Sequence, residues 1–191
     1  MTAVMVGDGS AEDSTRELTS PRIELSLGDI THAECDAIVS SICPSLRGGG
    51  QIDRIVRRRG GPIIEKQLER IREERLPAGV PVGGCVATGG GRMACTWVIH
   101  AAGPLWTGQP RSRSELAVTY LNALNVAADL GATRVAVPAL SVGACRFPLG
   151  EAAAIALHTA RSTTAPLKVV RFVLSNRLVY ATFVRALAGH G

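Results

Sequence analysis

Three short segments combine glycine with small or polar side chains where the chain leaves a predicted strand. They are Gly28-Asp29-Ile30-Thr31, Gly48-Gly49-Gly50-Gln51 and Ser141-Val142-Gly143-Ala144. Glycine permits a close approach of the backbone, and free N–H groups at a helix N-terminus attract phosphate. The second segment leads directly into a predicted helix near Ile52. Since loops at the carboxyl ends of strands in an open α/β sheet converge on one crevice, we expect the three segments to form one phosphate-binding site.

Hydrophobic periodicity predicts that strands and helices alternate along the chain. Thr31 and Glu34 fit a capping box that opens a single helical turn. The strands are expected at 23–27, 36–40, 85–88, 97–101, 134–137 and 168–174, and the helices at 52–59, 62–75, 112–129, 149–159 and 176–188. This alternation implies one mainly parallel sheet that is covered by helices on both faces.

The chain has 191 residues, which is enough for one full-sized domain and too few for two ordinary ones. Residues 1–20 are polar and lack a hydrophobic period, so we expect a disordered leader before a single domain over 21–191. No apolar run approaches the length of a membrane span, and no signal peptide is evident. We therefore expect a cytoplasmic protein without membrane contact.

Several familiar nucleotide and metal motifs are missing. The two lysines, Lys66 and Lys168, do not belong to a P-loop, and neither a complete dinucleotide fingerprint nor a Gly-x-Ser-x-Gly elbow is present. The five cysteines are scattered and lack zinc-site spacing to histidine, which indicates free thiols. His100 lies in an apolar run and is expected to be a core residue with a hydrogen-bond partner. We expect neither a bound metal nor a cofactor.

The formal net charge is +5, which suits an anionic ligand without identifying it. The densest basic cluster is Arg54, Arg57, Arg58 and Arg59 on the predicted helix 52–59. A solvated helix face explains such a cluster well, and no aromatic side chains are interleaved with it. Nucleic-acid binding is therefore not favoured.

The motifs together resemble the macrodomain family, whose members bind ADP-ribose and related metabolites and in some cases remove ADP-ribose from proteins. The resemblance implies a three-layer α/β/α sandwich with a mixed, mainly parallel sheet and a ligand crevice at the C-terminal ends of the strands. It covers residues 22–188 and rests on the order and spacing of Gly28-Asp-Ile-Thr31, Asp36-Ala-Ile-Val39, Leu46-Arg-Gly-Gly-Gly50, Ile52-Asp53, Val98-Ile-His-Ala-Ala-Gly-Pro104, Pro138-Ala-Leu-Ser-Val-Gly143 and Phe147-Pro148.

The resemblance also assigns ligand contacts. It places Asp29 at the exocyclic amine of adenine, with Ile30 beside it, and it places the two later loops around the phosphates and the distal ribose. A carboxylate that accepts an N–H from a neutral base makes a charge-assisted hydrogen bond. The alternative for Asp29 is that it only caps the turn before Thr31. The expected ligand contacts are Asp29, Ile30, Ser40, Gly48, Gly49, Gly50, Gln51, Ile52, Ser141, Val142, Gly143, Ala144, Cys145, Arg146 and Phe147.

The catalytic positions depart from the family pattern. Hydrolytic macrodomains commonly carry Asn-Ala-Ala-Asn after the second strand, where this chain has Ser40-Ser41-Ile42-Cys43. A thiol cannot reproduce the paired hydrogen bonds of an amide, and Cys43 has no evident histidine base, so an inert thiol is expected. Asp53 stands where the family's water-activating aspartate stands, but a carboxylate in the first helical turn is also favoured by the helix dipole. Catalysis and capping both remain open for Asp53.

Further departures concern the ligand loops. Gln51 replaces a fourth glycine, and its side chain could crowd the phosphates or donate to them. Cys145 replaces an aromatic residue that often packs on the distal ribose. Arg146 could reach a phosphate instead, and Phe147 is either a hydrophobic wall or a core residue. The zinc-dependent branch of the family is not supported, because Cys43 lacks neighbouring ligands.

Three hypotheses follow. The first is a domain that binds ADP-ribose, either free or attached to a protein partner. The second is a hydrolase that removes ADP-ribose from acidic side chains, or deacetylates O-acetyl-ADP-ribose, using Asp53 and an ordered water. The third is a basic nucleic-acid-binding module that uses the arginines at 54–59.

Overall fold

The structure is a computed structural model that describes residues 20–189. Of the predicted leader, only Ser20 belongs to these residues. The described strands are β1 (Arg22–Leu27), β2 (Ala37–Ser41), β3 (Cys85–Gly89), β4 (Trp97–Ala101), β5 (Arg134–Val137) and β6 (Val169–Leu174). The helices are the short 3-10 turn η1 (Ile30–His32), α1 (Gln51–Gly60), α2 (Pro62–Glu74), α3 (Pro110–Asp129), α4 (Leu149–Ser162) and α5 (Arg177–Ala188).

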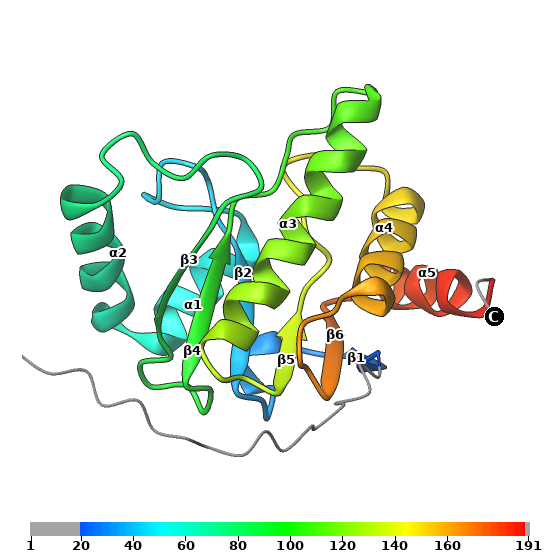
Figure 1. Cartoon of the computed structure of the whole chain (residues 1–191), viewed down its shortest axis with the longest axis horizontal. Coiled ribbons are helices and arrows are strands. Elements are labelled where there is room, and N and C mark those ends of the chain that lie inside the picture. Colours follow the sequence, from blue (N-terminus) through cyan, green and yellow to red (C-terminus); the bar gives the residue numbers. More distant parts are fainter. Residues whose placement is uncertain (1–19, 190–191) are drawn as a thin grey trace, which may run out of the picture.

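The described strands form one six-stranded sheet in the order β1-β6-β5-β2-β4-β3. Among them, β3 alone runs antiparallel to its neighbour. Figure 1 shows that the chain leaves β2 and β5 at the same edge of this sheet, so the loops after these strands lie on one side of the molecule. The prediction of a mixed, mainly parallel sheet is confirmed.

Helices cover both faces of the sheet (Figure 1), so the three-layer α/β/α sandwich is also confirmed. Helices α3, α4 and α5 pack on one face, where Val39 and Phe172 are buried. Helices α1 and α2 pack on the other face, where Ile38 and Val98 are buried. Successive residues of a strand point to opposite faces of the sheet. Because helices cover both faces, the residues of β2 are buried on both sides, and its apolar run is not interrupted by alternating polar residues.

The local structure after β1 differs from the expectation. Asp29, rather than Thr31, caps the short turn, because its carboxylate accepts hydrogen bonds from the Thr31 N–H at 2.9 Å and the Thr31 hydroxyl at 2.8 Å. The turn ends at His32, before Glu34, so the predicted capping box is wrong. An aspartate two residues before a backbone N–H satisfies it more directly than the longer reach from Glu34 would.

None of the described helices combines the length and apolar character that crossing a membrane would require.

Candidate functional site: a neutral cleft and an adjoining recess

A cleft of about 320 Å³ opens at the edge of the sheet where β2, β5 and β6 end. Three segments form its walls: the chain after β2 up to the start of α1, the loop after β5, and the chain from β6 into α5. These segments are far apart in sequence but meet because their strands are parallel neighbours. The lining residues are Ser41, Ile42, Cys43, Gly49, Gly50, Gln51, Ile52, Pro138, Ala139, Ser141, Val142, Gly143, Ala144, Cys145, Val173, Leu174, Ser175, Asn176 and Val179.

The first wall is a tightly folded glycine-rich loop. The Cys43 N–H donates to the Gly48 carbonyl at 2.8 Å, and Ile42 bridges to Gly49. A Cβ atom on Gly49 would lie 2.6 Å from the Ser41 carbonyl oxygen, so only glycine fits there. Gly50 is the N-cap of α1. The first backbone hydrogen bond of that helix runs from the Arg54 N–H to the Gly50 carbonyl. The preceding N–H groups therefore have no acceptor within the helix.

The second wall is the loop after β5, which is closed by a hydrogen bond of 3.0 Å from the Phe147 N–H to the Ser141 carbonyl. Ser141 has a φ of 63°, a left-handed conformation that is uncommon for a residue with a side chain. A Cβ atom on Gly103 would lie 2.4 Å from the Ser141 hydroxyl oxygen, so this glycine makes room for the strained serine. The loop thus presents Val142, Gly143 and Ala144 to the cleft as a short run of small residues.

The third wall was not predicted from the sequence. It contains Ser175 and Asn176, which follow β6, and Val179 on the first turn of α5. Asn176 is the N-cap of α5, where its side-chain oxygen accepts from the Val179 N–H at 3.0 Å. The signal that pointed to the other two loops, a polar segment directly after a predicted strand, was also present here.

No charged side chain is found among the described residues that line the cleft. An anion in it would instead meet the free N–H groups at the start of α1 and the positive end of that helix's dipole. Polar side chains such as Gln51 and Asn176 could add hydrogen bonds. The cleft therefore suits a phosphate group that is recognised through the backbone.

A second recess adjoins the cleft on the side of β1. It is lined by Ser26, Leu27, Gly28, Asp29, His32, Ala33, Glu34, Arg171 and Val173. Val173 lines both spaces, so the two are neighbours. Burial acts to raise the pKa of Asp29, but the hydrogen bonds from Thr31 outweigh it and hold the pKa below its ordinary value. Asp29 is therefore an ionised acceptor beside the cleft at neutral pH.

Asp53 does not line the described cleft but lies buried behind the glycine-rich loop, with an exposed fraction of 0%. Its Oδ2 atom accepts a hydrogen bond of 2.8 Å from the Arg57 Nε–H, and burial raises its pKa despite the opposing effect of Arg57. A catalytic role for Asp53 remains a prediction. Arg57, expected on a solvated face, instead points inward with its side chain only 14% exposed.

Five other predicted contacts line neither the cleft nor the adjoining recess that the structure describes. Ile30 and Ser40 are buried in the interior, and Gly48 contributes the carbonyl that closes its loop. Arg146 is exposed, and Phe147 packs on Trp106 with ring centroids 4.6 Å apart. For Phe147, the core alternative that the sequence left open describes its environment.

Two cysteines line the cleft. Cys43 is exposed, and Cys145 is half-buried. Burial raises the pKa of Cys145, and a thiolate at Cys43 would raise it further. Within the described residues, no group of three potential metal ligands gathers anywhere.

His100 is a core residue, as predicted from its apolar surroundings. It is fully buried, and its Nε2 atom lies 2.9 Å from the Thr88 hydroxyl oxygen. Burial lowers its pKa to about 3, and the positive charge of Arg57 acts in the same direction. The neutral imidazole therefore belongs to the sheet interior.

The Macro domain family model matches residues 39–156. The chain belongs to the macrodomain family. The matched segment contains the glycine-rich loop and the loop after β5, which form two of the three walls of the cleft.

Named relatives agree with this assignment. The chain is 44% identical over 165 residues to a macro domain-containing protein in the sno 5′ region of Streptomyces nogalater, covering 86% of this chain and 91% of that one. It is 36% identical over 171 residues to the O-acetyl-ADP-ribose deacetylase of Klebsiella pneumoniae strain 342, covering 87% and 97%. A structure of a macrodomain variant from Oceanobacillus iheyensis with ADPR superposes with a TM-score of 0.85 and 28% identity, covering 91% and 95%.

Proposed function

We propose that this macrodomain binds ADP-ribose or a close derivative, either free or attached to a protein. The diphosphate would lie in the cleft against the start of α1, and the adenine would lie in the recess of Asp29. The observation that carries the proposal is the junction of two chemically different spaces at Val173. One is a neutral cleft with free backbone donors, and the other is a recess with an ionised acceptor.

The chemistry of the two spaces matches the two ends of the nucleotide. A diphosphate accepts hydrogen bonds, which the first turn of α1 can donate. The amino group of adenine donates, and a carboxylate has about four acceptor sites. Thr31 donates only to Oδ1 of Asp29, and Oδ2, which has a longer contact of 3.9 Å with His32 Nδ1, is left for the base. Support also comes from the Oceanobacillus macrodomain variant, whose structure is described as being with ADPR.

Titration calorimetry tests this proposal directly. We expect the purified protein to bind ADP-ribose without added metal and to bind AMP more weakly, because AMP lacks the second phosphate and the distal ribose. The sample should be shown to be folded by circular dichroism. Absence of heat with ADP-ribose up to millimolar concentration would overturn the proposal.

A second candidate function is deacetylation of O-acetyl-ADP-ribose, which is favoured by the 36% identity to the Klebsiella deacetylase. In this chain Cys43 lines the cleft where the family's hydrolytic members commonly carry an asparagine. If this candidate is correct, acetate release by the wild type should be slow but measurable, and release by Cys43→Asn should be faster, because the amide can hold the ribose or a water in place. Rapid release by the wild type without any gain in Cys43→Asn would contradict this account.

A further inference from the structure

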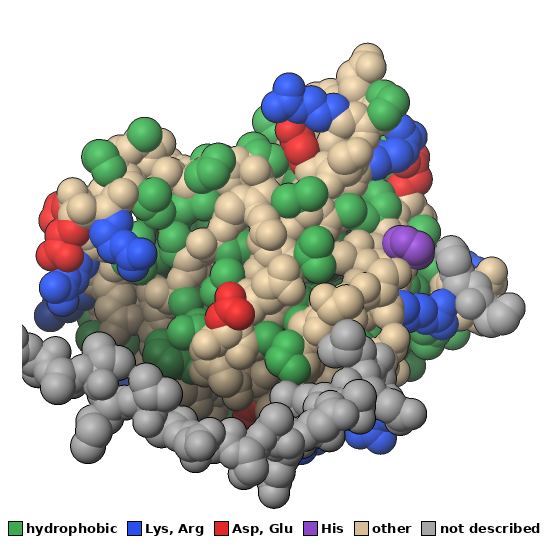
Figure 2. All heavy atoms as spheres, viewed as in Figure 1, with side chains coloured by type: hydrophobic (Ala, Val, Ile, Leu, Met, Phe, Trp, Pro, Cys, Tyr) green, Lys and Arg blue, Asp and Glu red, His purple; other side chains and the backbone are tan. Residues whose placement is uncertain are grey.

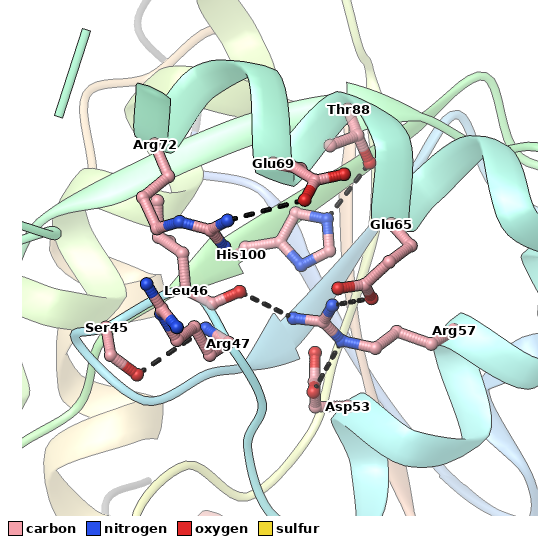
Figure 3. Close-up of polar contacts among 10 residues, drawn as sticks. All are labelled: Ser45, Leu46, Arg47, Asp53, Arg57, Glu65, Glu69, Arg72, Thr88 and His100. Carbon is pink, nitrogen blue, oxygen red and sulfur yellow. Dashed lines mark hydrogen bonds and ion pairs between the residues drawn. The ribbon is translucent and has the colours of Figure 1, made fainter. Parts of the chain in front are cut away.

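Arg57 makes three polar contacts behind the glycine-rich loop (Figure 3). Its Nε–H donates to Asp53 Oδ2 at 2.8 Å, one terminal nitrogen donates to the Leu46 carbonyl at 3.1 Å, and the other binds Glu65. The partners come from α1, from the loop and from α2. A planar guanidinium can hold three acceptors in fixed directions, which an ammonium group cannot do in the same way.

The contact with Leu46 fixes the start of the loop. Leu46 has a φ of 59°, in the left-handed region that leucine rarely adopts. Its side chain is fully buried, and its N–H donates to the Cys43 carbonyl at 3.0 Å. The Arg57 hydrogen bond occupies the remaining polar group of this residue, its carbonyl. Both backbone polar groups of Leu46 are thus hydrogen-bonded, and they hold the residue in the conformation that leads the chain into the glycine-rich loop.

The contact with Asp53 fixes the end of the loop. A Cβ atom on Gly49 would lie only 2.7 Å from the Asp53 Cβ, so the two backbones are in close contact. Asp53 is fully buried, and its Oδ1 atom has no partner among the described residues. Without Arg57 this carboxylate would be a buried charge with no counter-ion, which is strongly unfavourable. The position of Asp53 against Gly49 therefore depends on Arg57.

We propose that Arg57 is a positioning residue that holds both ends of the glycine-rich loop, at Leu46 and at Asp53, so that the first turn of α1 faces the bound diphosphate. Asp53 contributes to this arrangement as the buried acceptor of the Arg57 Nε–H. The inference builds on the proposed binding of ADP-ribose.

The test compares Arg57→Met with Arg54→Met, which removes an exposed arginine one turn away on the same helix. Hydrogen exchange is measured without ligand. We expect faster exchange of the backbone amides of residues 43–49 in Arg57→Met and no change in Arg54→Met. Because this readout needs no nucleotide, it separates a failure of the positioning role from a failure of the proposed function. Unchanged exchange in a folded Arg57→Met would overturn the inference.

Affinity for ADP-ribose provides the second readout. Arg57→Met should weaken binding about tenfold. This corresponds to the loss of one backbone hydrogen bond to the charged diphosphate when the start of α1 is no longer held in place. Asp53→Asn keeps an acceptor for Arg57 and should bind nearly as the wild type does, whereas Asp53→Ala should resemble Arg57→Met. If Asp53→Ala keeps full affinity, the positioning role is wrong.

A further variant covers the case in which Arg57→Met does not fold. The double variant Arg57→Met, Asp53→Asn removes both buried charges, so it avoids an unpaired carboxylate. We expect it to fold, to exchange rapidly at residues 43–49 and to bind ADP-ribose weakly. Wild-type exchange and affinity in the double variant would show that the network stabilises the fold only, and would overturn the proposal.

Discussion

Two hollows of this molecule differ sharply in charge. The cleft at the ends of β2, β5 and β6 has no charged side chain among its described residues. A larger recess of about 570 Å³ lies near the other end of α1 and is lined by Thr31, His32, Glu34, Arg58, Arg59, Arg92, Met93 and Ala94. The first has the backbone features of a phosphate site, and the second is lined by three arginines, Arg58, Arg59 and Arg92.

Under the proposed function the diphosphate lies in the neutral cleft and not among the arginines, so net charge would be a poor guide to the position of the phosphate site. Arg58 and Arg59 are near the C-terminal end of α1, where the helix dipole disfavours anions. The neutral cleft lies at the N-terminal end of the same helix, where the dipole and the free N–H groups favour them. On the face in Figure 2, acidic and basic side chains also lie side by side, in agreement with ion pairs such as Arg111–Glu115 and Arg70–Glu74.

The largest expected effect comes from filling the neutral cleft. A Cβ atom on Gly50 would meet nothing within 4 Å, and its φ of −74° is allowed for any residue. We therefore expect Gly50→Val to fold with only a small loss of stability, because valine is a poorer N-cap than glycine, but to bind ADP-ribose about 100-fold more weakly, because the side chain would occupy the space of the phosphates. Urea unfolding and calorimetry measure the two quantities.

Two controls sharpen this prediction. Gly150→Val adds the same side chain at a glycine of α4 that also has open space, outside the cleft, and should change neither quantity. Gly49→Val should lose stability as well as affinity, because its Cβ would overlap the Ser41 carbonyl. If Gly50→Val binds like the wild type, the diphosphate does not lie against the start of α1.

A smaller effect is expected at the recess of Asp29, where the adenine is proposed to lie. Asp29→Ala should weaken ADP-ribose binding about tenfold, because it removes a charge-assisted hydrogen bond. Asp29→Asn is a useful companion, since its oxygen can still cap the turn at Thr31. Binding of ADP-ribose by Asp29→Ala at wild-type affinity would show that this recess does not hold the base.

The smallest effect is expected at the arginine-lined recess. Replacing Arg58, Arg59 and Arg92 together by Gln should change ADP-ribose affinity less than about threefold, since exposed charges are screened by salt. A larger loss would mean that side-chain charge, and not the neutral cleft, dominates phosphate binding. The same variant tests the nucleic-acid hypothesis: tight, salt-resistant RNA binding that disappears with the three arginines would favour it.

Much of the fold could be predicted because the signals are local. The apolar runs and the alternation of elements place all the described strands and the five longer helices within a few residues of where they lie. The two glycine-containing loops were found for the same reason. The residues that characterise each loop are consecutive in the sequence, and the convergence of the two loops follows from the parallel arrangement of their strands.

The parts that could not be predicted depend on contacts between distant segments. The inward turn of Arg57 requires acceptors at Leu46, Asp53 and Glu65, and nothing in the run of arginines distinguishes it from Arg58. Likewise, the motif that places Asp53 in the site does not show that its side chain lies behind Gly49. Side-chain direction on a helix becomes clear only when the neighbouring elements are known.

The pairing of β1 with β6 has a consequence for the timing of folding. Glu24 on β1 binds Arg171 on β6 at 2.7 Å across a separation of 147 positions. Contacts so distant in sequence form late, because a long loop must close first. During synthesis Asp29 emerges early, whereas Arg171 and Val173, which complete its recess, emerge near the end. A nascent chain therefore lacks the complete recess, so under the proposed function ADP-ribose would stabilise the protein only after almost all of it has left the ribosome.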